Sequence, residues 1–148
     1  MNLASRKAGN AINVGADPAA VAVTPNGRTV YVADEGSGTV TPVDVATDRP
    51  GQPVTVGAGP RAIAMTPGGR IAYVLNWAGG SVTPIDTVTG DALAPIPVGS
   101  YPVAIAMSAR TGTAYVANFG SDTVTPSRSR RTRRAVPSRP GTPPTRSR

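Results

Sequence analysis

The chain has 148 residues, a length typical of one domain, and it contains neither Cys nor His. This composition excludes a disulfide framework, a thiolate metal site and a cysteine nucleophile, and it removes the commonest general base. The formal net charge of +7 comes from the last residues: residues 1–126 carry seven Lys/Arg against eight Asp/Glu, whereas residues 127–148 carry eight Arg and no acid.

A repeat of 42 residues organises the chain from its first residues to residue 126. Short groups of residues recur in strict register, without insertion or deletion, which is typical of stacked repeat modules. The recurring groups are Val14-Gly15, Val56-Gly57 and Val98-Gly99, then Tyr31-Val32, Tyr73-Val74 and Tyr115-Val116, and last Val40-Thr41-Pro42, Val82-Thr83-Pro84 and Val124-Thr125-Pro126.

Each period predicts four short antiparallel strands, because runs of Val, Ile, Thr and Tyr alternate with Gly-rich turns. In the first period Asn26-Gly27 predicts a tight hairpin turn between the first two strands. Pro42 lies inside the third strand and has no amide proton, so it should face a bulge or an unpaired edge. The predicted strands of this period are 19–24, 29–34, 39–45 and 52–57.

Four antiparallel strands in about 42 residues match the size of a β-propeller blade. The sequence therefore predicts an all-β fold, a partial and open β-propeller of three four-stranded repeats. In the third period the glycine of the first hairpin is shifted within residues 108–113, so that hairpin should differ locally.

The repeats resemble the YVTN family of β-propeller repeats, which is related to the lactonase-like propellers. The resemblance covers residues 1–126, and it implies a propeller, often on extracellular or cell-surface proteins, without implying one activity. The motifs that carry it are Tyr31-Val32-Ala33-Asp34, Tyr73-Val74-Leu75-Asn76 and Tyr115-Val116-Ala117-Asn118, with Pro25-Asn26-Gly27 before the first.

The ends of the repeat do not coincide with blade boundaries. Met1 to Leu3 align with the third strand of a period, so we expect the chain to open inside a truncated blade. At positions 127, 138 and 147 the repeat predicts isoleucine-like residues, but the sequence has Ser there. If these serine codons begin with TC, a shift of the reading frame by one base would restore apolar residues at the three positions. The expected units are 1–15 as the end of a blade, 16–57, 58–99, 100–126 as an incomplete blade, and 127–148 as a disordered, Arg/Ser/Pro-rich tail, either frameshifted or genuine.

Three repeats do not close a ring comfortably, since propellers usually have about four to eight blades. Two apolar blade faces should stay open, which predicts marginal stability, aggregation or self-association through these faces. One hypothesis is that two chains close a six-bladed ring. No apolar run approaches the ~20 residues of a membrane span, so a membrane partner is not expected. The acidic residues are scattered rather than clustered, so neither a metal site nor a cofactor is expected.

The best candidates for ligand contacts are residues that depart from the repeat in the loops before the first and after the second strand. By analogy with other propellers, these loops lie on the ligand-binding face. Aromatic residues there could stack on a flat ligand, or they could simply pack over the blade ends. The candidates are Asp17, Glu35, Arg61, Trp77, Tyr101 and Phe119.

With no His, no Cys and no evident catalytic constellation, the sequence favours a non-enzymatic scaffold for an unknown ligand or protein partner. The resemblance implies an extracellular or cell-surface location, although the N-terminus shows no signal peptide. One alternative is a lactonase-like enzyme, with Arg61 and Glu35 as the only opposite charges on that face. Another is nucleic-acid binding by the basic tail, which would be salt-sensitive and is not favoured.

Overall fold

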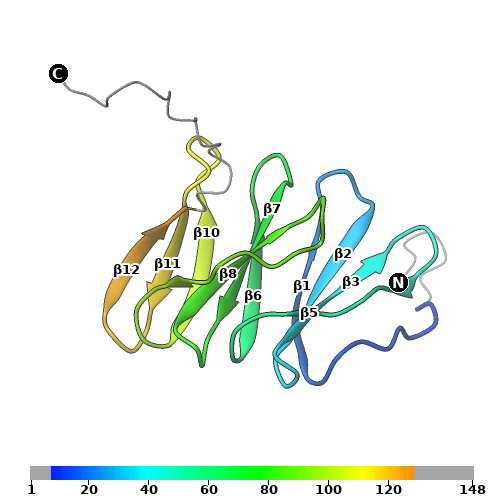
Figure 1. Ribbon diagram of the computed structural model, residues 1–148, viewed down its shortest axis with the longest axis horizontal. Helices are drawn as coiled ribbons and strands as arrows, with labels where there is room; N and C mark the ends of the chain where they lie inside the picture. Colours follow the sequence, from blue (N-terminus) through cyan, green and yellow to red (C-terminus); the bar gives the residue numbers. More distant parts are fainter. Residues whose placement is uncertain (1–7, 129–148) are drawn as a thin grey trace, which may run out of the picture.

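The computed structural model describes residues 8–128, which form three antiparallel sheets side by side (Figure 1). The first sheet comprises β1 (Pro18–Val23), β2 (Thr29–Asp34), β3 (Thr39–Asp44), β4 (Arg49–Pro50) and β5 (Val54–Thr55). The middle sheet comprises β6 (Pro60–Met65), β7 (Ile71–Asn76), β8 (Ser81–Asp86) and β9 (Ile96–Pro97). The third sheet comprises β10 (Pro102–Met107), β11 (Ala114–Asn118) and β12 (Thr123–Ser127).

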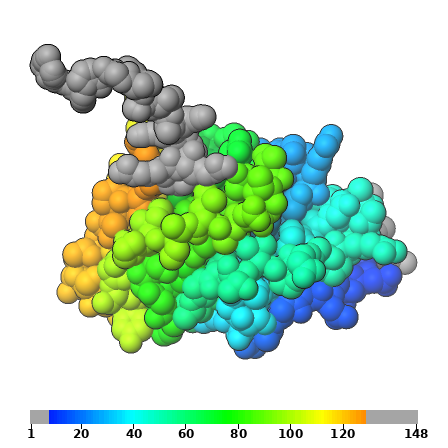
Figure 2. All heavy atoms as spheres, in the orientation of Figure 1, coloured from blue at the N-terminus to red at the C-terminus, as the bar shows by residue number. Residues whose placement is uncertain are grey.

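The sheets follow one another in sequence order and do not close a ring, which confirms the predicted open, all-β propeller fold. Figure 2 shows them as successive bands of colour along the longest axis of the molecule. Strand β6 contacts both β1 and β10, so the first strand of each sheet lies at the inner edge of the stack. No helix in the described residues is long and apolar enough to cross a membrane.

Pro42 explains why the outer edge of the first sheet is interrupted. Strand β4 pairs with Val43 and Asp44, and β5 pairs with Thr39 and Val40, so neither outer strand pairs with Pro42. The Pro42 carbonyl accepts a 2.7 Å hydrogen bond from the Gly51 amide on that side. The prediction of an unpaired edge at this proline is therefore confirmed.

The first hairpin of the third period also differs as predicted. The Gly112 amide donates to the Ser108 carbonyl, four residues earlier, whereas the Gly27 amide donates to the Thr24 carbonyl, three residues earlier. The hairpin keeps the same length but its glycine is displaced by one position, and β11 begins at Ala114, one position later than its equivalents β2 and β7. Both glycines have positive φ, 71° and 73°, which a residue with a side chain adopts at a cost.

Two apolar cores lie between the sheets rather than within them. The first packs Tyr31 and Val40 of the first sheet against Val74 and Ile85 of the middle sheet. The second joins the middle and third sheets in the same way, through Ile71, Tyr73, Leu75, Val82, Ala114 and Val116. Each sheet thus has a forward face, which carries the Tyr31-type residue, and a backward face, and each face needs a neighbour to cover it.

A buried polar position recurs at the end of the second strand of every sheet. In the middle sheet Asn76 is fully buried, and its Nδ2 donates to Ser81 Oγ at 3.1 Å and to Thr83 Oγ1 at 2.8 Å. A Cβ added to Gly57 would lie 2.7 Å from Asn76 Nδ2. The recurring Val-Gly pair therefore leaves room for this side chain, and the same holds for Gly15 beside Asp34.

The turn after β8 is held by a buried carboxylate. Arg70 Nε and Nη2 donate to Asp86 Oδ1 and Oδ2, each at 3.0 Å, and the Asp86 side chain is fully buried. The backbone amides of Val88 and Thr89 donate to Asp86 Oδ1 at 2.9 and 3.3 Å. The hydrogen bond from Arg70, helped by these amides, lowers the pKa of Asp86 from 3.8 to about 2 although burial opposes the shift.

Acid should weaken the fold through Asp86. The pKa of Asp86 is lower in the folded chain than in the unfolded chain. The stabilising effect of the Asp86 carboxylate is therefore complete above about pH 4 and is lost as the pH falls toward 2. We expect this carboxylate to contribute on the order of 2 kcal/mol to the free energy of unfolding at neutral pH. Urea titrations between pH 2 and 7 should show the acid-dependent loss in wild type and a smaller one in Asp86→Asn.

The matched control for this prediction is Asp44→Asn, which changes the equivalent carboxylate of the first sheet. Asp44 is exposed, and its Oδ1 accepts a hydrogen bond from the Ala46 amide. Asp44→Asn should keep the wild-type response to acid. An equal loss of acid response in both variants would contradict the assignment to Asp86.

Much of the predicted tail lies outside the described residues. Of residues 127–148, the structure describes Ser127, which ends β12, and Arg128, whose Nη2 donates to Thr113 Oγ1 at 3.1 Å. The predictions of a frameshift and of nucleic-acid binding fall largely on residues 129–148, and the predicted blade remnant at 1–15 is described only from residue 8.

Candidate functional site

Each inner strand begins with a β-bulge, and the bulge of β6 carries Arg61. Pro60 pairs with Asn76 and Ala62 pairs with Leu75, so Arg61 between them has no partner on β7. The same irregularity occurs in β1 and β10, at Ala19 and Val103. A bulge bends its strand and redirects a side chain, which is why bulges are common beside functional sites. Only the middle sheet has a charged residue at this position.

Arg61 forms an ion pair with Glu35, which lies in the loop after β2 of the first sheet. Arg61 Nη2 lies 2.6 Å from Glu35 Oε2, and the two side chains are 40% and 30% exposed. An ion pair with this much exposure contributes little to stability. Both charged groups stay accessible from solvent, so they are available to a ligand.

Two aromatic rings extend this pair toward the third sheet. The Arg61 guanidinium carbon lies 4.4 Å from the centroid of the Trp77 ring, at cation–π distance. The Trp77 and Tyr101 ring centroids are 5.0 Å apart, with the ring planes tilted by 42°. Glu35, Arg61, Trp77 and Tyr101 therefore form a continuous row across the three sheets, here called the loop-face row.

Tyr101 occupies a backbone conformation that is unusual for a bulky residue. Its φ is 47°, and the equivalent residues are Asp17 with φ 53° and Gly59 with φ 67°. A residue other than glycine pays about 1–3 kcal/mol for such a conformation, and this strain tends to be kept at functional sites. Tyr101 is also 50% exposed, so burial of its ring does not by itself explain its presence there.

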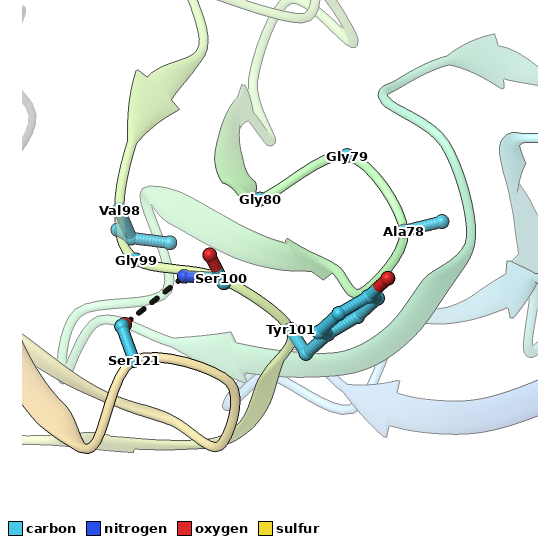
Figure 3. A pocket seen from close by; sticks show the side chains of 8 residues that line it. All are labelled: Ala78, Gly79, Gly80, Val98, Gly99, Ser100, Tyr101 and Ser121. Carbon is cyan, nitrogen blue, oxygen red and sulfur yellow. Dashed lines mark hydrogen bonds between the residues drawn. The ribbon is translucent and has the colours of Figure 1, made fainter.

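A shallow hollow of about 460 Å³ lies beside Tyr101, between the loops of the middle and third sheets. Figure 3 shows the Tyr101 ring reaching toward Ala78 across this hollow. Ser121 Oγ accepts a hydrogen bond from the Ser100 amide at 3.1 Å and fixes the far wall. The lining residues are Ala78, Gly79, Gly80, Val98, Gly99, Ser100, Tyr101 and Ser121.

This hollow was not among the features predicted from the sequence, although the sequence contains one signal of it. Gly79 stands where the other two repeats carry Ser37 and Ser121. In those repeats the serine Oγ accepts the amide of Ala16 or Ser100. The middle repeat lacks this hydroxyl, and the small residues there leave the space open.

Four of the six predicted ligand-binding residues come together in the loop-face row. Asp17 and Phe119 do not take part in its ion pair, cation–π or ring contacts, judged over the described residues. The Asp17 carbonyl accepts the Glu35 amide at 2.9 Å, and its carboxylate lies over Gly36. Phe119 is 74% exposed, and its amide donates to the Tyr101 carbonyl at 3.0 Å.

Within residues 8–128, no group of three or more Asp and Glu side chains is arranged to hold a metal ion. The loop-face row itself offers one carboxylate, one guanidinium and two aromatic rings, next to an open hollow. A guanidinium can bind and stabilise an oxyanion, and a carboxylate can accept a proton. Aromatic rings can support the apolar face of a ring-shaped ligand.

The fold and the inner-edge bulges define this protein as a β-propeller. Residues 20–125 match the family model described as "Lactonase, 7-bladed beta-propeller". The chain belongs to this lactonase family of propellers. No curated protein matches the chain.

Solved structures agree with this fold. The chain is 31% identical to hydrazine synthase from Kuenenia stuttgartiensis, with a TM-score of 0.67 over 74% of this chain and 31% of that one. It is similar to a putative 6-phosphogluconolactonase from Bacteroides fragilis, with 20% identity and a TM-score of 0.69 over 80% of this chain and 36% of that one. A putative 6-phosphogluconolactonase from Bacteroides uniformis gives 16% identity and a TM-score of 0.61, over 74% of this chain and 39% of that one.

The two putative 6-phosphogluconolactonases are less than 25% identical to this chain, so these two similarities establish the fold alone. The chain spans less than half the length of each of these three structures.

The family match corrects one prediction. The prediction that the protein is not an enzyme is wrong at the level of the family, because the matching family model is that of a lactonase. The chain contains neither His nor Cys. That absence excludes only mechanisms that need an imidazole or a thiolate, because carboxylates also act as general bases. The lactonase-like alternative is the better interpretation.

Proposed function

We propose that this chain carries part of the substrate-binding face of a lactonase-type propeller, and that Glu35 and Arg61 act in the opening of a lactone ring. One observation carries this proposal. This chain belongs to a family of lactonases, and the bulge at the start of β6 places the Arg61 guanidinium 2.6 Å from the Glu35 carboxylate. Both groups are partly exposed on the loop face.

The chemistry is the addition of water to an ester carbonyl. Water adds to the lactone carbonyl carbon, the ring C–O bond breaks, and a hydroxy acid is released. We assign to Arg61 the donation of hydrogen bonds to the carbonyl oxygen as negative charge develops there. We assign to Glu35 the acceptance of a proton from the attacking water, a proton that is then passed to the departing alkoxide.

The aromatic part of the loop-face row is proposed to orient the substrate. A lactone ring has an apolar face made of C–H groups, which suits contact with the rings of Trp77 and Tyr101. The hollow beside Tyr101 would hold the rest of the molecule. The half-exposed ring of Tyr101 supports this role, because it is accessible to a ligand.

Trp77 is the only tryptophan in the chain, so its fluorescence reports directly on this site. Titration with δ-gluconolactam, an analogue that resists hydrolysis, should give a saturable change in emission. Arg61→Ala should weaken that binding by roughly 10- to 100-fold, because it removes a charged hydrogen-bond donor. The proteins are compared by the change in Trp77 emission on adding the lactam, because Arg61→Ala itself alters the emission of the free protein.

Arg110→Ala is the matched control, because it removes an exposed cation from the hairpin between β10 and β11, at the end of the third sheet away from Tyr101. It should bind the lactam as wild type does. Acid release from δ-gluconolactone at constant pH measures the activity itself, and the wild-type chain should exceed the spontaneous rate. Equal binding by Arg61→Ala and Arg110→Ala would refute the proposed role of Arg61.

A further inference from the structure

The middle sheet lacks a loop hydrogen bond that both other sheets have. In the third sheet Ser121 Oγ accepts the Ser100 amide at 3.1 Å, and the first sheet has the same bond at 2.7 Å. The equivalent residues of the middle sheet are Gly79 and Ala58. Gly79 has no hydroxyl, and the Ala58 amide donates to no acceptor among the described residues.

A second amide of the same pair of loops is also left without a protein acceptor. In the first sheet the Gly36 amide donates to the Ala16 carbonyl at 2.9 Å, and the third sheet repeats this bond. The middle sheet has Ala78 in place of Gly36, but there the Gly79 amide donates to the Ala58 carbonyl instead, at 3.0 Å. The Ala78 amide therefore has no partner within residues 8–128.

Both amides belong to the loops that carry the loop-face row. Ala58 lies three residues before Arg61, and Ala78 directly follows Trp77. The Trp77 amide donates to the Gly59 carbonyl at 2.8 Å and thereby holds the two loops together. Ala58 and Ala78 are both exposed, and Figure 3 shows Ala78 on the loop beside the hollow. The two free donors are thus within reach of a ligand bound on this face.

We infer that this pair of loops is a subsite for a hydroxyl group of the ligand, which takes the role that the serine Oγ has in the other two sheets. The structure itself supplies the precedent, because a hydroxyl oxygen accepts the equivalent amide in both of them. A phosphate or carboxylate fits less well. Residues 57–59 and 78–80 are all Gly or Ala, so they provide no cation to pair with an anion.

The ligand class that follows is a polyhydroxylated ring. The inference rests on the proposed function only in so far as that ring is a lactone, since the hydroxyl subsite itself requires no lactone chemistry. It deepens the proposal by selecting hydroxylated lactones over unsubstituted ones. Gly79 is the residue that determines this selectivity, because its lack of a side chain leaves the Ala58 amide free.

Gly79 can be replaced by residues that test this role directly. Its φ is outside the positive range, and a Cβ added there would lie 3.2 Å from the Ala58 nitrogen. The hydroxyl of Gly79→Ser is then close enough to accept the Ala58 amide, as serine does in the other sheets. Gly79→Ala adds the same Cβ without an acceptor, so the two variants separate loss of the donor from crowding.

Titrations of the isotope-labelled, full-length chain show which amides contact the ligand. The probes are δ-gluconolactam and D-glucose, which carries similar hydroxyls but no lactone carbonyl. The nuclear magnetic resonance signals of the Ala58 and Ala78 amides should shift saturably with both probes. The Ser100 amide is the internal control, and its signal should stay in place because Ser121 already accepts its hydrogen bond.

The change in Trp77 emission gives the dissociation constants of the variants. Gly79→Ser should weaken δ-gluconolactam binding by roughly 3- to 10-fold, the value of one hydrogen bond, while Gly79→Ala should bind it as wild type does. With δ-valerolactam, which has no hydroxyl groups, Gly79→Ser and Gly79→Ala should not differ.

Three results would overturn the inference: equal weakening by the serine and alanine variants, a larger shift of the Ala58 signal with inorganic phosphate than with D-glucose, or no saturable shift at Ala58 and Ala78. Failure of the proposed function looks different. In that case Arg61→Ala binds the lactam as wild type does and acid release stays at the spontaneous rate, while the Ala58 and Ala78 signals still respond to D-glucose.

Discussion

Replacing Tyr73 by Ala should lower the free energy of unfolding by about 3–5 kcal/mol, the loss typical of large side chains removed from a core. Tyr73 is 1% exposed and packs with Ile71, Leu75 and Val82 between the middle and third sheets. Its removal leaves a cavity in a core that two sheets share. Urea unfolding, followed by the far-ultraviolet circular dichroism of the strands, measures the loss.

Tyr115→Ala is the natural control, because the two tyrosines are equivalent in the repeat and differ in burial. Tyr115 is 46% exposed, so its removal from a single chain should cost much less. Both variants are compared at dilutions where the measured mass is that of one chain, so that association does not cover Tyr115. Equal losses for the two tyrosines would show that the sheets are not stacked in this order.

The fold was predictable because a propeller blade is specified by short-range patterns. Asn26-Gly27 marks a hairpin turn, Pro42 marks an interrupted edge, and the 42-residue period fixes how often these features recur. Each of these signals acts within one sheet. The outer strand was the least predictable, since Pro42 divides it into two short pieces, β4 and β5, on either side of the gap.

The site was predictable only in part. Departure from the repeat identified Glu35, Arg61, Trp77 and Tyr101, because a residue that differs among equivalent positions is not required by the common fold. The contacts between them depend on how neighbouring sheets are placed, and no local pattern encodes that placement. For the same reason the sequence could not show that Asp17 turns toward Gly36 instead of joining the row.

The bulge at the start of β6 was also missed. Its position follows from the register between β6 and β7, in which Arg61 has no partner. The repeats give no sign of it, because Ala19, Arg61 and Val103 share no chemistry. The enzyme prediction failed for a different reason, since it treated the absence of His and Cys as the absence of any general base.

Arg61→Ala should reduce kcat/KM for lactone opening by about 100- to 1,000-fold, the loss seen when one donor to a developing oxyanion is removed. Glu35→Gln should reduce it by about 100- to 10,000-fold, because an amide cannot accept the proton from water. Neither change should unfold the protein, since the ion pair is partly exposed and contributes little to stability. Circular dichroism checks that both variants keep their strands.

The most direct measurement is the initial rate of acid release from δ-gluconolactone by wild type, Arg61→Ala and Arg110→Ala, at one pH and one enzyme concentration. If the loop-face row is the reactive surface, wild type and Arg110→Ala turn over the lactone at the same rate, and Arg61→Ala falls to near the spontaneous rate. Equal rates for the two arginine variants, or a wild-type rate no faster than hydrolysis in buffer, would contradict the assignment.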